Sequence, residues 1–173
     1  MDQTDVGLKS VVKALTDTVA GAIDPADHLA REQLKLAASY VDFVRQRLHL
    51  IHARERYDLT HYIALARALL AIGLPEASPA VAAMRAALGE AEPLARDPAA
   101  LTGRIRLVAM ELAHAVAGVV QDAHRTQSGV APQIDRAVIA ASEEKLEMER
   151  LWYRPIGFDP SPDVGARLED YFK

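Results

Sequence analysis

The chain has 173 residues, a formal net charge of −4 and no cysteine. This length fits a single domain with one hydrophobic core, and the lack of cysteine excludes disulfides, thiolate catalysis and cysteine-ligated metal sites. No long basic block suggests a nucleic-acid partner, and no apolar run approaches the roughly 20 residues that a membrane-spanning helix needs. The polar, acidic N-terminus lacks the features of a signal peptide, so we expect a cytoplasmic protein without a membrane or nucleic-acid partner.

The composition favours helices over strands. The chain holds 32 alanines, the strongest helix formers, whereas residues of high strand propensity rarely alternate with polar ones. Helix starts are indicated where a good N-cap precedes a proline, and helix ends where a glycine follows an apolar stretch. The starts are Asp24-Pro25, Ser78-Pro79, Asp97-Pro98 and Pro132, and the ends are Gly73, Gly89 and Gly129.

Between these marks the apolar residues recur at steps of three and four, which predicts amphipathic helices. We expect six, at approximately 4–22, 25–55, 59–72, 79–90, 98–126 and 132–153. No proline or glycine separates the second from the third, so the two form one long helix unless Asp58 caps a break. The sequence therefore predicts an all-α protein, an up-and-down bundle of five to six helices in one domain over residues 1–173.

Two segments differ from this pattern. The helix expected at 98–126 is apolar around most of its circumference, which is typical of a central helix. Residues 154–173 form a partly irregular tail, and Asp163 could cap a last short helix that carries Leu168, Tyr171 and Phe172. The aromatic residues in and just before this tail, Phe158 among them, either pack on the chain's own bundle or lie across a second subunit, and we expect a homodimer.

The stretch VRQRLHLIHARERYDLTHY, residues 44–62, concentrates histidine and arginine. On a helix, Arg45, His49, His52 and Arg56 form one stripe beside the apolar seam. The His-x-x-His spacing could chelate a metal, but the flanking arginines oppose a cation and suit an anion. We interpret the stripe, together with His61, as a candidate site for an anionic small molecule or an acidic partner surface, against the alternative of a solvated helix face.

A second candidate is Glu111-Leu-Ala-His114, whose Glu-x-x-His pattern resembles the half-motif that ferritin-like di-iron proteins use twice. The resemblance implies a metal site, or an acid–base site, in the core of the bundle. The Glu143–Glu149 run, with Lys145 inside it, is instead typical of an exposed helix face.

The signatures of nucleotide binding, nucleophilic catalysis and zinc hydrolysis are missing from the sequence. We therefore expect a non-enzymatic binding or assembly module with no cofactor. The alternatives are an enzyme centred on Glu111 and His114, or an accessory subunit of a larger enzyme.

Overall fold

The structure, a computed structural model, describes residues 3–126, 128–157 and 167–172. Over these ranges the chain forms helices and no strand, which confirms the all-α prediction. Within the same ranges, no helix has both the length and the apolar character needed to cross a membrane. The chain divides into two compact units, which we call the hairpin unit (Met1–Leu50 and Trp152–Asp163) and the four-helix unit (Ile51–Leu151 and Val164–Lys173). The expectation of a single domain stays a prediction.

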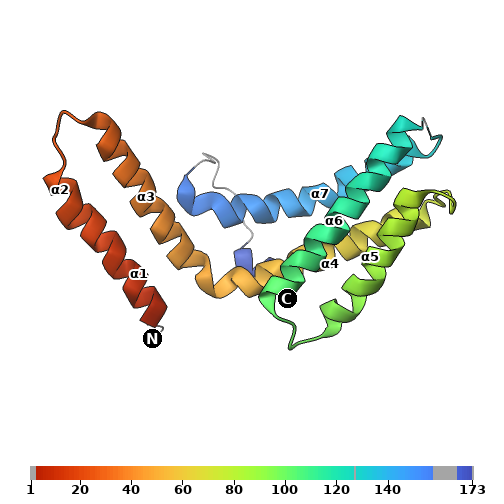
Figure 1. The fold of residues 1–173 in the computed structure, drawn as a ribbon, viewed down its shortest axis with the longest axis horizontal. Coiled ribbons are helices and arrows are strands. Elements are labelled where there is room, and N and C mark those ends of the chain that lie inside the picture. The colour runs from red at the N-terminus through yellow and green to blue at the C-terminus, as the bar shows by residue number, and fades with distance from the viewer. Residues whose placement is uncertain (1–2, 127, 158–166, 173) are drawn as a thin grey trace. The chain divides into compact units, whose positions relative to one another are not determined.

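The hairpin unit consists of two long antiparallel helical stretches (Figure 1). The first is formed by α1 (Gln3–Lys13), a π-helical segment η1 (Ala14–Val19) and α2 (Ala20–Ala22), and the second is α3 (His28–Arg47). The carboxylate of Asp24 accepts a hydrogen bond from the backbone N–H of Ala26, and Asp27 caps α3 by accepting from the N–H of Ala30. The predicted start at Pro25 is therefore wrong, because Asp24 closes a turn before the helix begins.

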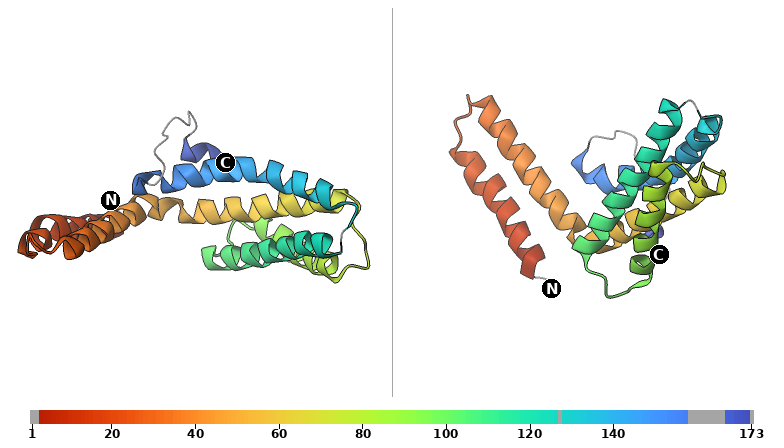
Figure 2. Two further views of the ribbon diagram at one scale, coloured as in Figure 1. Left: turned by 90° about the horizontal axis from the view of Figure 1, so that it is seen from above. Right: turned by 45° about the vertical axis from the view of Figure 1, so that its right-hand side comes forward.

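The four-helix unit contains α4 (Ile51–Ala71), α5 (Pro79–Arg96), α6 (Thr102–Arg125) and most of α7 (Ala131–Tyr153). Both α4 and α5 pack against α6, and α4 also packs against α5. Figure 2 shows α7 running beside α4, and an ion pair between Lys145 and Asp58 joins these two helices. Within this unit the consecutive helices α4 to α7 run in alternating directions, as in an up-and-down bundle (Figure 1).

Helix α6 is central within the four-helix unit, as its apolar sequence predicts. Its core-facing residues are Ile105, Val108, Ala109, Leu112, Val116, Val119 and Ala123, all of them buried. Leu107 and Met110 on its other side are 55% and 62% exposed. Helix α6 is therefore central on one side and keeps one open face, to which part of its apolar circumference belongs.

The break between the second and third predicted helices lies at Leu48–Leu50, a 3-10 turn (η2), rather than at Asp58. Asp58 lies inside α4, so its predicted role as an N-cap is wrong. Its carboxylate instead accepts a hydrogen bond from Lys145 of α7.

The boundaries of α5 and α6 give mixed outcomes. Ser78 caps α5 as predicted, accepting from the N–H of Val81, and Gly73 ends α4 with a φ of 83° that favours glycine. The predicted end at Gly89 is wrong, because α5 continues to Arg96 with Pro93 inside it. The predicted start at Pro98 is also wrong, because α6 begins only at Thr102.

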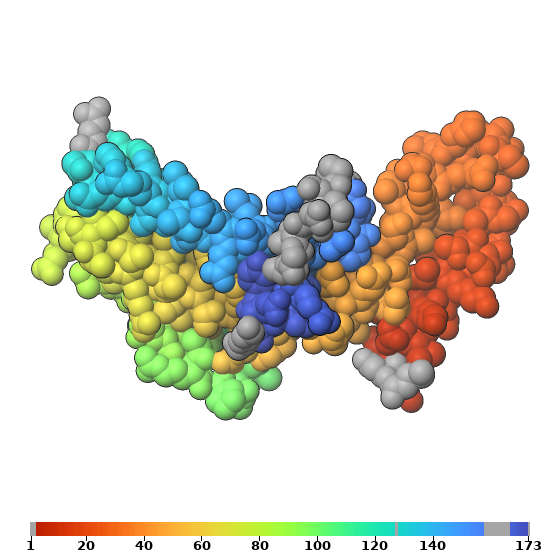
Figure 3. All heavy atoms as spheres, turned by 180° about the vertical axis from the view of Figure 1, so that it is seen from behind, coloured from red at the N-terminus to blue at the C-terminus, as the bar shows by residue number. Residues whose placement is uncertain are grey.

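The described parts of the C-terminal tail contact the same chain. In the hairpin unit, a 3-10 turn η3 (Arg154–Ile156) packs against α3. In the four-helix unit, a second turn η4 (Leu168–Tyr171), dark blue in Figure 3, lies on the surface formed by α4 and α7. The Tyr171 ring meets that of Tyr57 edge-on at 6.1 Å, and its hydroxyl donates to Glu147. Phe158 and the predicted cap Asp163 lie outside the described residues, and a contact with a second subunit stays a prediction.

Candidate functional site

The histidine and arginine stripe is divided between the two units. Arg45 and His49 belong to the hairpin unit, whereas His52, Arg56 and His61 belong to the four-helix unit. The 3-10 turn at Leu48–Leu50 separates the two groups along the chain.

Arg45 joins the two helices of the hairpin. Its guanidinium donates to Asp5 on α1 at 3.0 Å and to Asp42 on α3 at 2.8 Å. The hydrogen bond from Arg45 holds the pKa of the Asp42 carboxyl below its usual value, although burial acts in the opposite direction. His49 is exposed and makes no hydrogen bond among the residues that the structure describes.

Arg56 and His52 hold the connection between α5 and α6. Arg56 donates to the backbone carbonyls of Ala95, at 2.6 Å, and Asp97, at 3.0 Å. These carbonyls lie at the C-terminal end of α5, where a positive charge is favoured by the helix dipole. The Nδ1 atom of His52 lies 2.9 Å from the hydroxyl of Thr102, the first residue of α6. Both arginines of the stripe thus bind groups of the protein itself, and anion binding by the stripe stays a prediction.

Glu111 and His114 are exposed on the open face of α6. Their predicted place in the bundle core is therefore wrong. No group of three or more histidine, aspartate or glutamate side chains in the described part of the chain could hold a metal ion.

A half-buried ionic cluster that the sequence did not reveal lies between α4 and α7. The ammonium of Lys145 is 2.5 Å from Asp58 and 3.3 Å from Glu149, and it lies 5.5 Å from the centre of the Tyr62 ring. The Lys145 side chain is only 17% exposed. Burial alone would lower the pKa of Lys145, but the hydrogen bond and charge of Asp58 outweigh burial and raise it.

His61 lies beside this cluster, and it is a predicted site residue that lines a cavity of the four-helix unit. Its ring stacks on Tyr57 and meets Tyr62 edge-on. Burial lowers the pKa of His61, and the nearby ammonium of Lys145 lowers it further, so the imidazole is neutral at pH 7. Burial likewise raises the pKa of Tyr57 to about 12, with help from the charge of Glu144.

Lys145 and Glu149 of this cluster, with His61 and Tyr62, line a groove of about 540 Å³ between α4, α6 and α7. Apolar side chains, including Leu65 and Val116, line most of the groove. An apolar cavity with a few convergent polar groups and shifted pKa values is the usual form of a small-molecule site. We call it the α4–α7 groove.

The exposed-face interpretation of the Glu143–Glu149 run is wrong at Lys145. The i, i+4 spacing of Lys145 and Glu149 is visible in the sequence, but their common partner Asp58 lies 87 residues from Lys145. That pairing depends on how α7 lies beside α4, so no local pattern reveals it.

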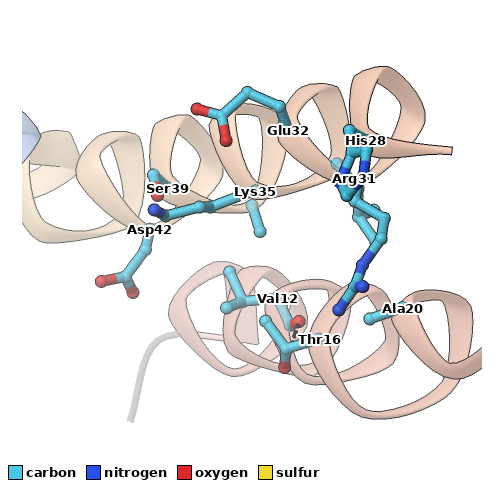
Figure 4. Close-up of a pocket in the computed structure, with 11 residues that line it drawn as sticks. Val12, Thr16, Ala20, His28, Arg31, Glu32, Lys35, Ser39 and Asp42 are labelled. Carbon is cyan, nitrogen blue, oxygen red and sulfur yellow. Dashed lines mark hydrogen bonds between the residues drawn. The ribbon is translucent and has the colours of Figure 1, made fainter. Parts of the chain in front are cut away.

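The hairpin unit has a groove of its own, of about 680 Å³, between the two antiparallel stretches. Figure 4 shows the Arg31 side chain reaching from α3 toward Thr16 and Ala20 on the facing stretch, while Glu32 points to the other side of α3. Arg31 and Lys35 form no ion pair among the described residues. The groove thus combines apolar side chains with the two cations and with the carboxylates of Glu32 and Asp42, which also belong to its lining.

Comparisons with protein families, with curated proteins and with solved structures give no match for this chain.

Proposed function

We propose that this protein is a non-enzymatic assembly module that pairs with a second copy of itself through the hairpin unit. The observation that carries the proposal is how little of this unit is covered. Among its described residues only Ala38, Phe43 and Trp152 are buried, and α1 has no buried residue. Helices with apolar stripes are stable in water when the stripes are covered, so the hairpin calls for a partner surface.

A row of large apolar side chains on α3 supports a helical partner. Leu29, Leu36 and Tyr40 follow one another at steps of seven and four, which places them on one face of the helix. Leu36 is 49% exposed and Tyr40 is 61% exposed. Two such hairpins packed face to face would form a four-helix arrangement and cover this row.

The cations of the hairpin are not part of the proposed contact. Arg31 and Lys35 line the groove that faces the opposite stretch of the same hairpin, on the other side of α3 from Leu36 and Tyr40. The contact with a second copy is therefore proposed to be mainly apolar.

Light scattering and sedimentation of the full chain test this proposal. We expect a dimer for the unaltered chain. The double substitution Leu36→Glu and Tyr40→Glu, which places two carboxylates on the apolar row, is expected to weaken the dimer by about 100-fold or more.

The matched control is Leu107→Glu with Met110→Glu, two similarly exposed residues on the open face of α6. The control protein should remain a dimer, and circular dichroism should show both variants helical. A monomeric unaltered chain at high concentration, or equal dissociation of the variant and the control, would contradict the proposal.

A further inference from the structure

The ionic cluster of Asp58, Lys145 and Glu149, two members of which line the α4–α7 groove, carries more negative than positive charge. The carboxylates of Asp58 and Glu149 share the single ammonium of Lys145. The neutral His61 adds no compensating charge. The exposed fractions of the Asp58, Lys145 and Glu149 side chains are 20%, 17% and 35%, so solvent screens these charges only partly. A second cation would lower the electrostatic energy of this cluster.

Glu149 and His61 are the groups of this site that can accept a hydrogen bond from a ligand. Asp58 receives a short hydrogen bond from Lys145, whereas Glu149 lies farther from the ammonium and is more exposed. His61 makes no hydrogen bond to the part of the chain that the structure describes, so a nitrogen of its neutral ring can accept one. Both residues line the groove.

The floor of the groove is suited to an apolar body. Leu65 and Val116 are buried core residues whose outer atoms line it, and Leu146 stands exposed at its rim. A ligand that covers these side chains gains apolar burial in addition to its polar contacts.

We propose that the α4–α7 groove binds a small molecule that has a protonated amine on an apolar or aromatic body. The amine would lie between Glu149 and His61, and the body would lie on Leu65 and Val116. The ammonium of Lys145 opposes a second cation, but the two carboxylates outweigh it. Anionic ligands are disfavoured by the same carboxylates. This site lies within the four-helix unit and goes beyond the proposed assembly function.

Calorimetric titration of the full chain at neutral pH with phenethylamine and, separately, phenylacetate tests the proposal. The two probes share an aromatic ring on a short carbon chain and differ in the sign of their charge. We expect phenethylamine to bind at least about tenfold more tightly. Equal binding of the two probes, tighter binding of phenylacetate, or no binding of phenethylamine would overturn the proposal.

Two substitutions locate the site. Glu149→Gln removes the available carboxylate and should weaken phenethylamine binding by about tenfold or more. Glu111→Gln removes an exposed carboxylate on α6 that does not line the groove, and it should leave binding unchanged. Unchanged binding in a folded Glu149→Gln protein would overturn the assignment.

The groove and the hairpin can be tested apart. The Leu36→Glu and Tyr40→Glu protein, which is expected to be monomeric, should bind phenethylamine as the unaltered chain does. Loss of amine binding in that variant, with its helices intact, would overturn a site contained in the four-helix unit.

Discussion

The hairpin unit and the four-helix unit are built from the same kind of amphipathic helix, yet only the second encloses a core. Leu59, Met84 and Leu112 are almost completely buried in the four-helix unit, whereas α1 of the hairpin has no buried residue. The difference follows from the number of neighbours. Helix α1 packs against a single long helix, α3, so its stripe is covered along one side, whereas α6 packs against both α4 and α5. An amphipathic pattern thus predicts that a stripe will be covered, and the number of helices nearby decides whether the same chain can cover it.

Truncating one leucine in each unit, buried in one case and half exposed in the other, would test this comparison with the largest expected effect. Leu112→Ala should lower the free energy of unfolding by about 2–5 kcal/mol, because it leaves a cavity in the core. Leu36→Ala should lower it far less when the protein is dilute enough to be monomeric, because Leu36 is half exposed there. Urea unfolding followed by circular dichroism measures both. Equal losses would mean that the hairpin is packed as tightly as the four-helix unit.

An effect of intermediate size is expected when the hydrogen bonds of Arg56 at the end of α5 are removed. Arg56→Ala should lower the free energy of unfolding of the four-helix unit by about 1–3 kcal/mol, because two backbone carbonyls lose a charged donor. The control Arg104→Ala removes an exposed ion pair with Glu90 and should cost about 0–1 kcal/mol. Thermal and urea unfolding distinguish the two. If Arg104→Ala were as destabilising as Arg56→Ala, the carbonyl contacts would not be the cause.

The smallest expected effect is the dependence of the four-helix unit's stability on the protonation of His61. Burial holds the folded-state pKa of His61 below its ordinary value of 6.5, so the unfolded chain takes up a proton more readily than the folded one. The stability associated with neutral His61 is present above pH 6.5 and is lost as the pH falls below that value, through the folded-state pKa.

His61→Phe keeps a ring beside Tyr57 and Tyr62 and removes this proton. Unfolding measured in steps from neutral to mildly acidic pH should show a smaller loss for the variant than for the unaltered chain. Lys145, Asp58 and Glu149 face His61 and are present in both proteins, so their titration is common to the two curves. If the stability of the two proteins depended on pH in the same way, the effect could not be assigned to His61.

The helices themselves were predictable because they depend on local spacing and local caps. Ser78 and Gly73 mark their helix ends through the backbone preferences of single residues. The end of α5 was not predictable in this way. Pro93 deprives the carbonyl of Gly89 of its hydrogen-bond partner, a combination typical of a helix end. Helix α5 nevertheless continues, and beyond Gly89 its residues Ala91, Leu94 and Ala95 pack in or against the core.

The features that depend on distant partners were outside the reach of local patterns. The stripe from Arg45 to Arg56 could be recognised in the sequence. Its interpretation as an anion site assumed that the two arginines were available, because the sequence does not show which groups they contact. In the structure, the carbonyls that bind Arg56 lie 39 and 41 residues away. The break at Leu48–Leu50 contains no proline or glycine, so nothing in its composition marks it.

The hydrogen bonds that Arg56 and His52 of α4 make to the connection between α5 and α6 suggest an order in which the helices of the four-helix unit assemble. Arg56 and His52 lie one helical turn apart, and their partners are the last carbonyls of α5 and the first residue of α6. These partners come together only when the short connection has brought α5 and α6 side by side. Closing that short loop costs less chain entropy than bringing α4 into place. We therefore expect the α5–α6 pair to form early, and α4 to complete the unit by docking against an end that is already in place.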